Sequence, residues 1–411
     1  MPADRRPRPC HERGDRLRGR VRHGQERQPD RRRQSAVEWQ PGEGRQLRGG
    51  GAPQLLGTRF SGVVGQHAVP SGSVGQRPHA PKKTYVPEEV EFRTKPQLAM
   101  AQIDRAWGNG VRVSAWTFDE LYGRDGKFLD GLESQQQVFV AEIPRDFQGW
   151  VRKPQVLEKG PENTRLGHPK GYPRLAKGYH SSEVRTLAKH SPVFRKQTHQ
   201  RYRIKDTDKG PEVWEVKWTV FWRKNGEGLP TRRHSLIVAR NVLTEEVKYF
   251  LSNRVPGERN PVSGQCITLR WLLRVAFGRW SIESCFRETK EELGLDHYEV
   301  RGWRCLHRHF YVTGLSHLFC ARVRQQYDKS SEDQLDRITV EQVRSAMNVW
   351  LDAADLPASA RRQRFEGELE KQQYYQRRSK QARRSHTKTS SRRLTTMGID
   401  VEKIKSCIPD I

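Results

Sequence analysis

The chain has 411 residues, with 76 Lys and Arg against 48 Asp and Glu, a formal net charge of +28 and a pI near 10.2. Its length gives room for about two or three structural units. The basic balance indicates a polyanionic partner, because Lys and Arg that neutralise phosphates release counterions. No apolar run approaches the length of a membrane span, and the six scattered Cys, without a Cys-x-x-Cys pair, indicate a reducing compartment. These features argue against a membrane protein and against a disulfide-rich secreted protein.

The first 81 residues differ in composition from the rest of the chain. They contain 16 Arg but no Lys, Ile, Asn or Tyr, all of which appear freely from Lys82 onward. The missing residues have AT-rich codons, so this segment resembles GC-rich DNA translated in a shifted reading frame. Its scattered apolar residues lack a periodicity that could bury a core, and we expect residues 1–81 to be largely disordered. The alternative is a natural basic segment that binds nucleic acid.

Helical and strand patterns alternate between residues 82 and 150. Helices are predicted at residues 95–107 and 126–132, and strands at residues 111–119 and 137–143. This alternation predicts an α/β unit. Asp119 stands where the first apolar strand ends, which is a position from which a sheet can present a carboxylate. An Asp in such a position also serves as a turn residue or helix cap.

Residues 151–265 predict an inserted β-rich region. Residues 160–189 are rich in Gly, Pro, Lys and Arg, which indicates either an exposed connection facing nucleic acid or an ordinary surface loop. β-branched and aromatic residues then predict strands at residues 213–222, 234–239 and 246–251.

The remainder of the chain predicts a helical part, residues 266–357, and a basic tail, residues 358–411. Residues 306–326 are apolar enough to form a helix that packs on the sheet, and residues 340–351 predict another helix. Cys285, Cys305 and Cys320 fall in apolar helical contexts and are expected to be buried. Residues 398–411 regain some apolar pattern and predict a short docked helix.

One predicted helix carries a charged face of unusual composition. Helical spacing places four charged residues on this face: Arg279, Glu283, Arg287 and Lys290. The opposite, core-facing side comprises Ile282, Cys285, Phe286, Thr289 and Leu293, and Gly294 supplies a stop. A lone carboxylate among cations suits a site that holds a divalent metal against a phosphodiester. The alternative is an amphipathic helix with an ordinary charged surface.

The spacing Arg279, three residues, Glu283, six residues, Lys290 resembles the Tyr-Arg-Glu-Lys signature of the DDE transposases encoded by bacterial insertion sequences. Ala276 stands where that signature has Tyr, with Phe277 beside it. Residues 294–309 resemble the segment that follows the catalytic Glu in this family. Residues 116–125 resemble the block around the second catalytic Asp, which corresponds here to Asp119.

The resemblance implies an RNase H-like sheet with helices, interrupted by a β insertion, in an endonuclease that cleaves DNA and transfers strands in transposition. It implies Mg²⁺, or Mn²⁺, held by two Asp and one Glu, with Asp119 and Glu283 as metal ligands. Arg279 and Lys290 would complete the catalytic residues by holding backbone phosphates. Further DNA contacts are implied for Arg287, Arg301, Trp303, Arg304 and Arg308. The implied partners are transposon ends and target DNA, with a homodimer as an option in the DNA complex, in the cytoplasm at the nucleoid.

The first Asp of the implied triad is expected on an opening strand well before Asp119. Asp4, Asp15 and Asp30 lie among Arg and Gly rather than at the end of an apolar strand. We therefore expect a transposase-like chain whose cleavage is defective. The alternatives are a non-catalytic DNA-binding remnant and an unrelated basic RNA-binding protein, although no RNA-binding motif stands in a supporting context.

Overall fold

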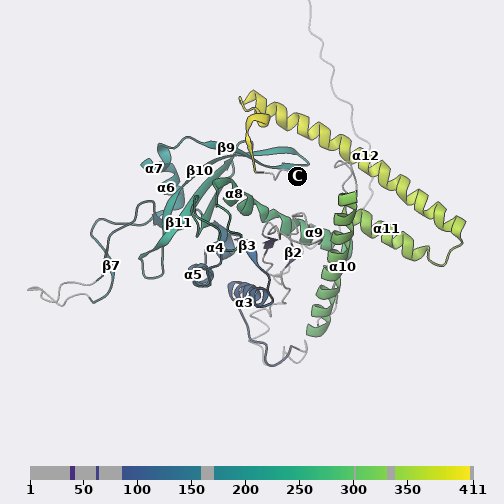
Figure 1. Ribbon diagram of the computed structural model, residues 1–411, viewed down its shortest axis with the longest axis horizontal. Coiled ribbons are helices and arrows are strands. Elements are labelled where there is room, and N and C mark those ends of the chain that lie inside the picture. Colours follow the sequence, from purple (N-terminus) through teal and green to yellow (C-terminus); the bar gives the residue numbers. More distant parts are fainter. Residues whose placement is uncertain are drawn as a thin grey trace, which may run out of the picture.

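The computed structural model describes residues 38–41, 62–63, 86–158, 171–299, 302–330 and 338–407. It shows a mixed α/β fold in which helices cover one large sheet and the C-terminal part is helical (Figure 1). The predicted fold class is confirmed at this level. The disorder expected for residues 1–81 lies outside the described residues, except for two short strands, β1 (Glu38–Pro41) and β2 (Gly62–Val63). No helix in the described ranges is long and apolar enough to cross a membrane.

The large sheet runs in the order β13-β9-β10-β11-β12-β4-β3-β1-β2, and β5 and β8 join it beside β10. Its further strands are β3 (Val113–Phe118), β4 (Phe139–Ile143), β5 (Gln148–Trp150), β8 (Ser182–Glu183), β9 (Gln200–Thr207), β10 (Gly210–Lys224), β11 (Pro230–Asn241), β12 (Val247–Ser252) and β13 (Lys405–Ser406). β3 pairs in parallel with β4, and β1 pairs antiparallel with β3. Two short strands, β6 (Val156–Leu157) and β7 (Arg174–Leu175), pair separately.

The strands of the predicted β-rich insert continue the sheet begun by β3 and β4. β10 and β11 form a long antiparallel pair, and β12 pairs with both β11 and β4. Two short helices, α6 (Val184–His190) and α7 (Pro192–Arg195), precede β9. The insert therefore extends the same sheet.

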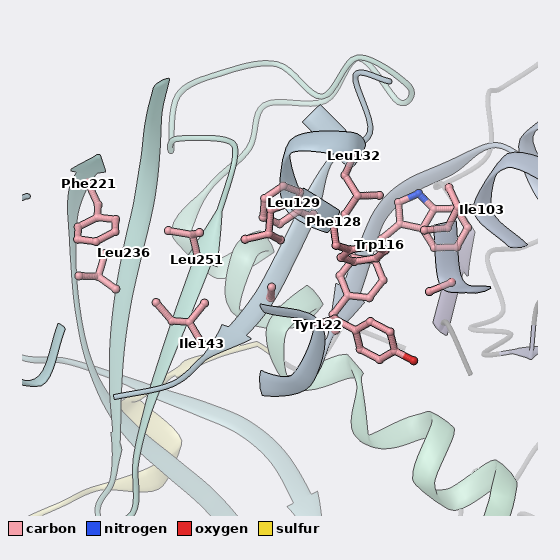
Figure 2. Packing of buried hydrophobic residues seen from close by; sticks show 14 of the residues in the cluster. Ile103, Trp116, Tyr122, Phe128, Leu129, Leu132, Ile143, Phe221, Leu236 and Leu251 are labelled. Atoms are coloured by element: carbon pink, nitrogen blue, oxygen red, sulfur yellow. The ribbon is translucent and has the colours of Figure 1, made fainter. Parts of the chain in front are cut away.

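One face of the sheet is covered by α3 (Lys95–Gly108) and α5 (Gly126–Ser134). Figure 2 shows Phe128, Leu129 and Leu132 of α5 beside Trp116 and Tyr122. The Phe128 ring also meets Phe118 edge-on, with 4.9 Å between ring centroids. Each fully buried Leu or Phe contributes about 1.5–3 kcal/mol, so this cluster fixes the end of β3 firmly.

The opposite face of the sheet is covered by α8 (Leu269–Gly278), which continues into α9 (Trp280–Leu293). Leu272 and Leu273 of α8 are fully buried in a second cluster, against residues such as Val140 and Trp214. Phe277, which stands beside the missing signature Tyr, packs on the rings of Trp214 and Phe250. The α8–α9 junction is thereby held against the sheet.

The helical C-terminal part comprises α10 (Trp303–Ser330), α11 (Val340–Asp352) and α12 (Ala358–Thr396). The main partners of α10 are α9 and α11, with Cys320 buried against Val340 and Val343. The expectation that this helix packs on the sheet was wrong. Its periodicity indicates an apolar face but not which element meets that face. Cys285 and Cys320 are buried as expected, whereas Cys305, on the first turn of α10, is exposed.

The predicted basic tail forms one continuous helix, α12, which crosses the molecule as the long yellow rod in Figure 1. After it, the chain turns at Gly398, which has a φ of 71°. A 3₁₀ turn, η1 (Val401–Lys403), then leads to β13, which pairs with β9. The predicted short helix after residue 398 is therefore corrected to a 3₁₀ turn and an edge strand, because the open edge of β9 offers backbone partners to an extended chain.

Candidate active site

The carboxyl ends of β3 and β4 bring two acidic residues to one edge of the sheet. The parallel register pairs Thr117 with Val140 and Phe118 with Ala141, so Asp119 and Glu142 are the next residues along each chain. Asp119 caps the short helix α4 (Glu120–Gly123), and its carboxylate accepts a hydrogen bond from the Leu121 N–H at 3.0 Å. The sequence motif thus places Asp119 at a strand end, as predicted, and also gives it a helix-capping role.

Gly123 allows α4 to lie directly on β4. A Cβ atom at this position would come within 2.0 Å of the Glu142 carbonyl oxygen and 3.3 Å of the Ile143 side chain. Real Cβ contacts are not that short, so any larger residue must push α4 away from the strand. The glycine therefore sets the distance between the Asp119 turn and Glu142.

Glu142 is the acidic residue that sequence reasoning missed. Its side chain is only 19% exposed and forms ion pairs with Lys248 of β12, at 3.2 Å, and with Arg279, at 3.9 Å. The sequence pattern that could have identified it is a single Glu within an otherwise apolar strand. Its importance depends on the register between β3 and β4, which the local pattern does not specify.

Glu283 projects from the first turn of α9 and is 52% exposed. Its carboxylate forms an ion pair with Arg279, with 2.8 Å between the nitrogen and the oxygen. The same guanidinium reaches Glu142, so Arg279 bridges a carboxylate on the strand edge and a carboxylate on the helix. The helix N-terminus also favours an acidic residue at the position of Glu283.

The predicted helix around this signature is confirmed. Ile282, Cys285 and Thr289 are buried on one side, and Gly294 ends the helix in the left-handed conformation with a φ of 68°. Lys290 lies half-buried in the last turn of α9, whereas Arg287 is exposed and approaches Glu291 at 4.0 Å.

The remaining predicted DNA contacts lie on or just before α10. Trp303, Arg304 and Arg308 occupy its first two turns, and both arginines are exposed on one side, a turn apart. The Trp303 ring lies 4.3 Å from the ring of His307, so it already has a neighbour within the chain. Arg301 lies outside the described residues.

The positions of the acidic side chains show whether the site could coordinate the metal ion that the resemblance implies. Among the residues that the structure describes, no three His, Cys, Asp or Glu side chains gather so as to hold a metal ion. Mg²⁺ requires near-octahedral oxygen coordination. Here Glu142 and Glu283 are instead both joined to a guanidinium. The described residues therefore do not form the implied three-carboxylate site.

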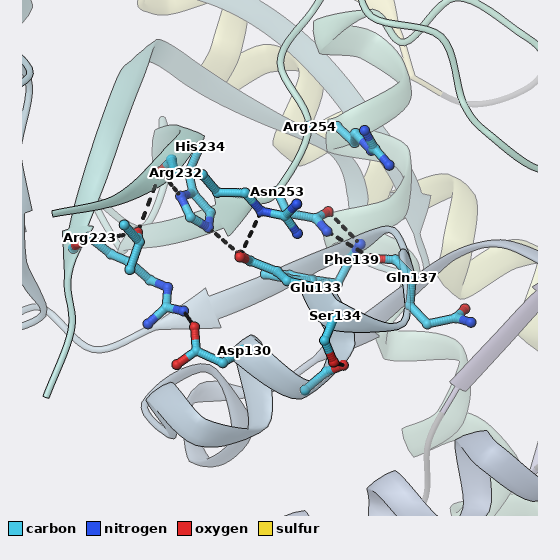
Figure 3. Close-up of polar contacts among 12 residues, drawn as sticks. Asp130, Glu133, Ser134, Gln137, Phe139, Arg223, Arg232, His234, Asn253 and Arg254 are labelled. Atoms are coloured by element: carbon cyan, nitrogen blue, oxygen red, sulfur yellow. Dashed lines mark hydrogen bonds and ion pairs between the residues drawn. The ribbon is translucent and has the colours of Figure 1, made fainter.

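A separate cluster of polar side chains lies between α5 and the sheet (Figure 3). His234 is fully buried, with Nε2 2.5 Å from Glu133 and Nδ1 2.7 Å from the Arg232 carbonyl oxygen. Both ring nitrogens thus lie within hydrogen-bond distance of an oxygen. Arg223, also buried, pairs with Asp130.

The pKa of Glu133 reflects this cluster. Burial raises the pKa of the Glu133 carboxyl, but the hydrogen bond from His234 and the charges of His234, Arg232 and Arg223 outweigh burial and lower it overall. The cluster ties α5 to β10 and β11. We assign it a structural role.

The comparisons with known proteins agree with part of this picture. A family model described as DDE superfamily endonuclease matches residues 63–211. A search of curated proteins finds no match to the chain. The matched range contains Asp119, Gly123 and Glu142 but ends before Arg279 and Glu283, and it begins within the segment whose composition predicts a shifted frame. The chain thus contains a domain similar to the DDE superfamily endonucleases, which supports a nuclease-type function with DNA as the substrate.

Proposed function

We propose that this chain is a DDE-type DNA transposase of the insertion-sequence kind whose cleavage and strand transfer are impaired, while its DNA binding is retained. The observation that carries the proposal is the position of Arg279, in contact with both Glu142 and Glu283 beside the strand end that presents Asp119. The match over residues 63–211 supports the endonuclease part.

In this proposal Asp119 and Glu283 are the metal ligands, for Mg²⁺ or Mn²⁺, and the first Asp that would complete the set is missing. Arg279 is occupied by two carboxylates instead of being free for a backbone phosphate. Lys290, Arg287, Arg304 and Arg308 remain available to phosphates, and Trp303 and Arg301 are further proposed DNA contacts. Contacts of this kind position DNA without reading its sequence.

We propose transposon ends and target DNA as the partners, met by the chain in the cytoplasm at the nucleoid, with a homodimer as the form that holds two ends. A second candidate function is that of a DNA-binding remnant with no cleavage at all. The many exposed Arg and Lys side chains of α12 favour retained DNA binding in both candidate functions.

The test is a Mg²⁺-dependent cleavage assay on DNA that carries the flanking terminal repeats. It compares the chain, a Glu283→Gln variant, and a protein whose N-terminal segment is restored to the other reading frame. We expect only the frame-restored protein to cut, and Glu283→Gln to abolish cutting when introduced into it. Cleavage by the chain as it stands, lost with Glu283→Gln, would contradict the proposed impairment.

A further inference from the structure

The C-terminal half of α12 is fastened to the sheet along one side. Leu394 is fully buried beside Val213 and Val242, and the Ser390 hydroxyl donates a hydrogen bond to the Lys209 carbonyl oxygen. Gly210 lies so close that a Cβ there would meet Ser390 at 2.7 Å. Arg383 pairs with Asp208 at 2.9 Å. These contacts define the inner side of the helix.

The opposite side of α12 carries a basic stripe. We define the outer stripe as Tyr374, Arg377, Arg378, Lys388 and Arg392, all of them exposed. These residues fall at i, i+3, i+4, i+14 and i+18, which is one face of a 3.6-residue helix. That face points away from the side on which Leu394 is buried. At 1.5 Å per residue the stripe spans about 27 Å of the helix, so it forms an extended track and not a point contact.

The cations of the outer stripe have no acidic partner in the part of the chain that the structure describes. No acidic residue occurs in α12 after Glu370, and no ion pair connects the stripe cations to any residue that the structure describes. The N-terminal half of the helix differs, because Arg362 pairs with Glu366, and Lys371 pairs with Glu368. A helix that is polar on every side gains little from its own packing, and like charges a turn apart repel. A polyanion along the stripe would remove that repulsion.

We propose that the outer stripe of α12 is the main phosphate-binding surface for duplex DNA in this protein. The choice of DNA as the polyanion rests on the proposed function. The new element is the place of binding, which lies on α12, outside both the matched residues 63–211 and the strand edge. Arg377, Arg378, Lys388 and Arg392 contact backbone phosphates, and the Tyr374 hydroxyl, which accepts from Arg378 at 3.5 Å, keeps its own proton to donate to a phosphate oxygen. Such contacts bind duplexes of any sequence.

The experiment measures binding of a fluorescent random-sequence duplex by anisotropy across a salt titration. The stripe variant changes Arg377, Arg378, Lys388 and Arg392 to Gln. The control variant removes the same number of charges from exposed cations elsewhere, by changing Arg93, Arg105, Lys127 and Lys189 to Gln. Each phosphate contact contributes about 0.9 to the slope of log affinity against log salt. We expect the stripe variant to lose about 3 to 4 units of slope and about 100-fold in affinity at low salt, and the control variant to stay within about threefold of the unchanged protein.

The possible failures are distinguishable. If the unchanged protein binds duplex DNA but the stripe variant binds equally well with the same salt slope, the assignment of α12 is wrong and the proposed function survives. If the unchanged protein binds no duplex, both fail. Preference for an equally long RNA duplex in competition would overturn the choice of DNA. Circular dichroism of the stripe variant verifies that a loss of binding does not come from a loss of helix.

Discussion

At the carboxyl edge of β3 and β4, charged side chains lie within a packed framework, whereas on α12 they project from a helix exposed on nearly every side. Glu142 and Glu283 are paired with Arg279, Glu142 is also paired with Lys248, and the position of Glu142 depends on close backbone packing at Gly123. The cations of the outer stripe have no such partners among the residues with described positions. Substitutions in the sheet region should therefore change stability, and substitutions on α12 should change binding.

The largest expected loss of stability comes from breaking the buried pair of His234 and Glu133, between β11 and α5. Replacing His234 by Leu leaves the Glu133 carboxylate, only 10% exposed, without its main partner. Removing one partner of a buried pair costs about 3–5 kcal/mol when the other is left unpaired. Glu133 keeps its ion pair with Arg232 at 2.7 Å, so we expect the free energy of unfolding in urea to fall by about 3 kcal/mol, the lower end of that range. The double variant His234→Leu/Glu133→Leu should recover part of the loss. A single variant as stable as the unchanged protein would show that the pair does not hold α5 to the sheet.

The next effect concerns the close approach of α4 to β4. Gly123→Ala forces a Cβ against the Glu142 carbonyl oxygen, and overpacking of this kind costs about 1–3 kcal/mol. Gly126→Ala is the matched control, because its Cβ would meet only the Arg223 side chain, at an ordinary 3.5 Å. We expect urea unfolding to show destabilisation by the first variant alone. Equal stability of the two variants would mean that α4 is not held tightly on the strand.

The free energy of unfolding is expected to depend on pH through His317, which joins α10 to α9. Burial lowers the pKa of His317, but its hydrogen bonds to Cys285 and Glu288 outweigh burial and raise the pKa to about 9. The folded state thus holds this proton more tightly than the unfolded state does. The resulting stability is fully present below about pH 6.5 and declines as the pH rises through 9. Unfolding measured from pH 6 to 10 should show a fall that is smaller in His317→Gln; identical profiles would refute this role.

The smallest expected effect on stability belongs to the outer stripe. Replacing exposed surface residues usually changes the free energy of unfolding by no more than about 0.5 kcal/mol. The stripe variant should therefore unfold like the unchanged protein in urea while it loses DNA affinity. A marked loss of stability would mean that the stripe packs against part of the chain, and the contrast with the sheet region would disappear.

Much of the secondary structure follows from local sequence patterns. The helices that became α3, α5 and α9 and the strands that became β3, β4, β10, β11 and β12 were predicted near their observed bounds, because their periodicity and turn residues are strong. The end of α9 at Gly294 follows from the left-handed conformation that glycine tolerates.

What the sequence could not supply is pairing between distant residues. Glu142 becomes part of the site only because β4 lies in parallel register with β3, and Arg279 reaches it only because α8 packs on the same sheet. For the same reason the partner of α10 was mistaken, and the segment after Gly398 was predicted as a helix although the edge of β9 draws it into a strand. The roles of Asp119, Glu283 and Lys290 remain predictions.

We propose that Arg279, through its ion pairs with Glu142 and Glu283, keeps these carboxylates from binding a metal ion at the strand edge. Calorimetric titration of Mn²⁺ into the unchanged protein, Arg279→Gln and Arg279→Gln/Glu142→Gln tests this proposal. We predict that Arg279→Gln binds Mn²⁺ in a range where the unchanged protein shows no saturable binding, because the substitution frees Glu283 and leaves Glu142 paired with Lys248 alone. The double variant should lose this added binding. Equal, saturable Mn²⁺ binding by the unchanged protein and Arg279→Gln would show that Arg279 does not block the carboxylates.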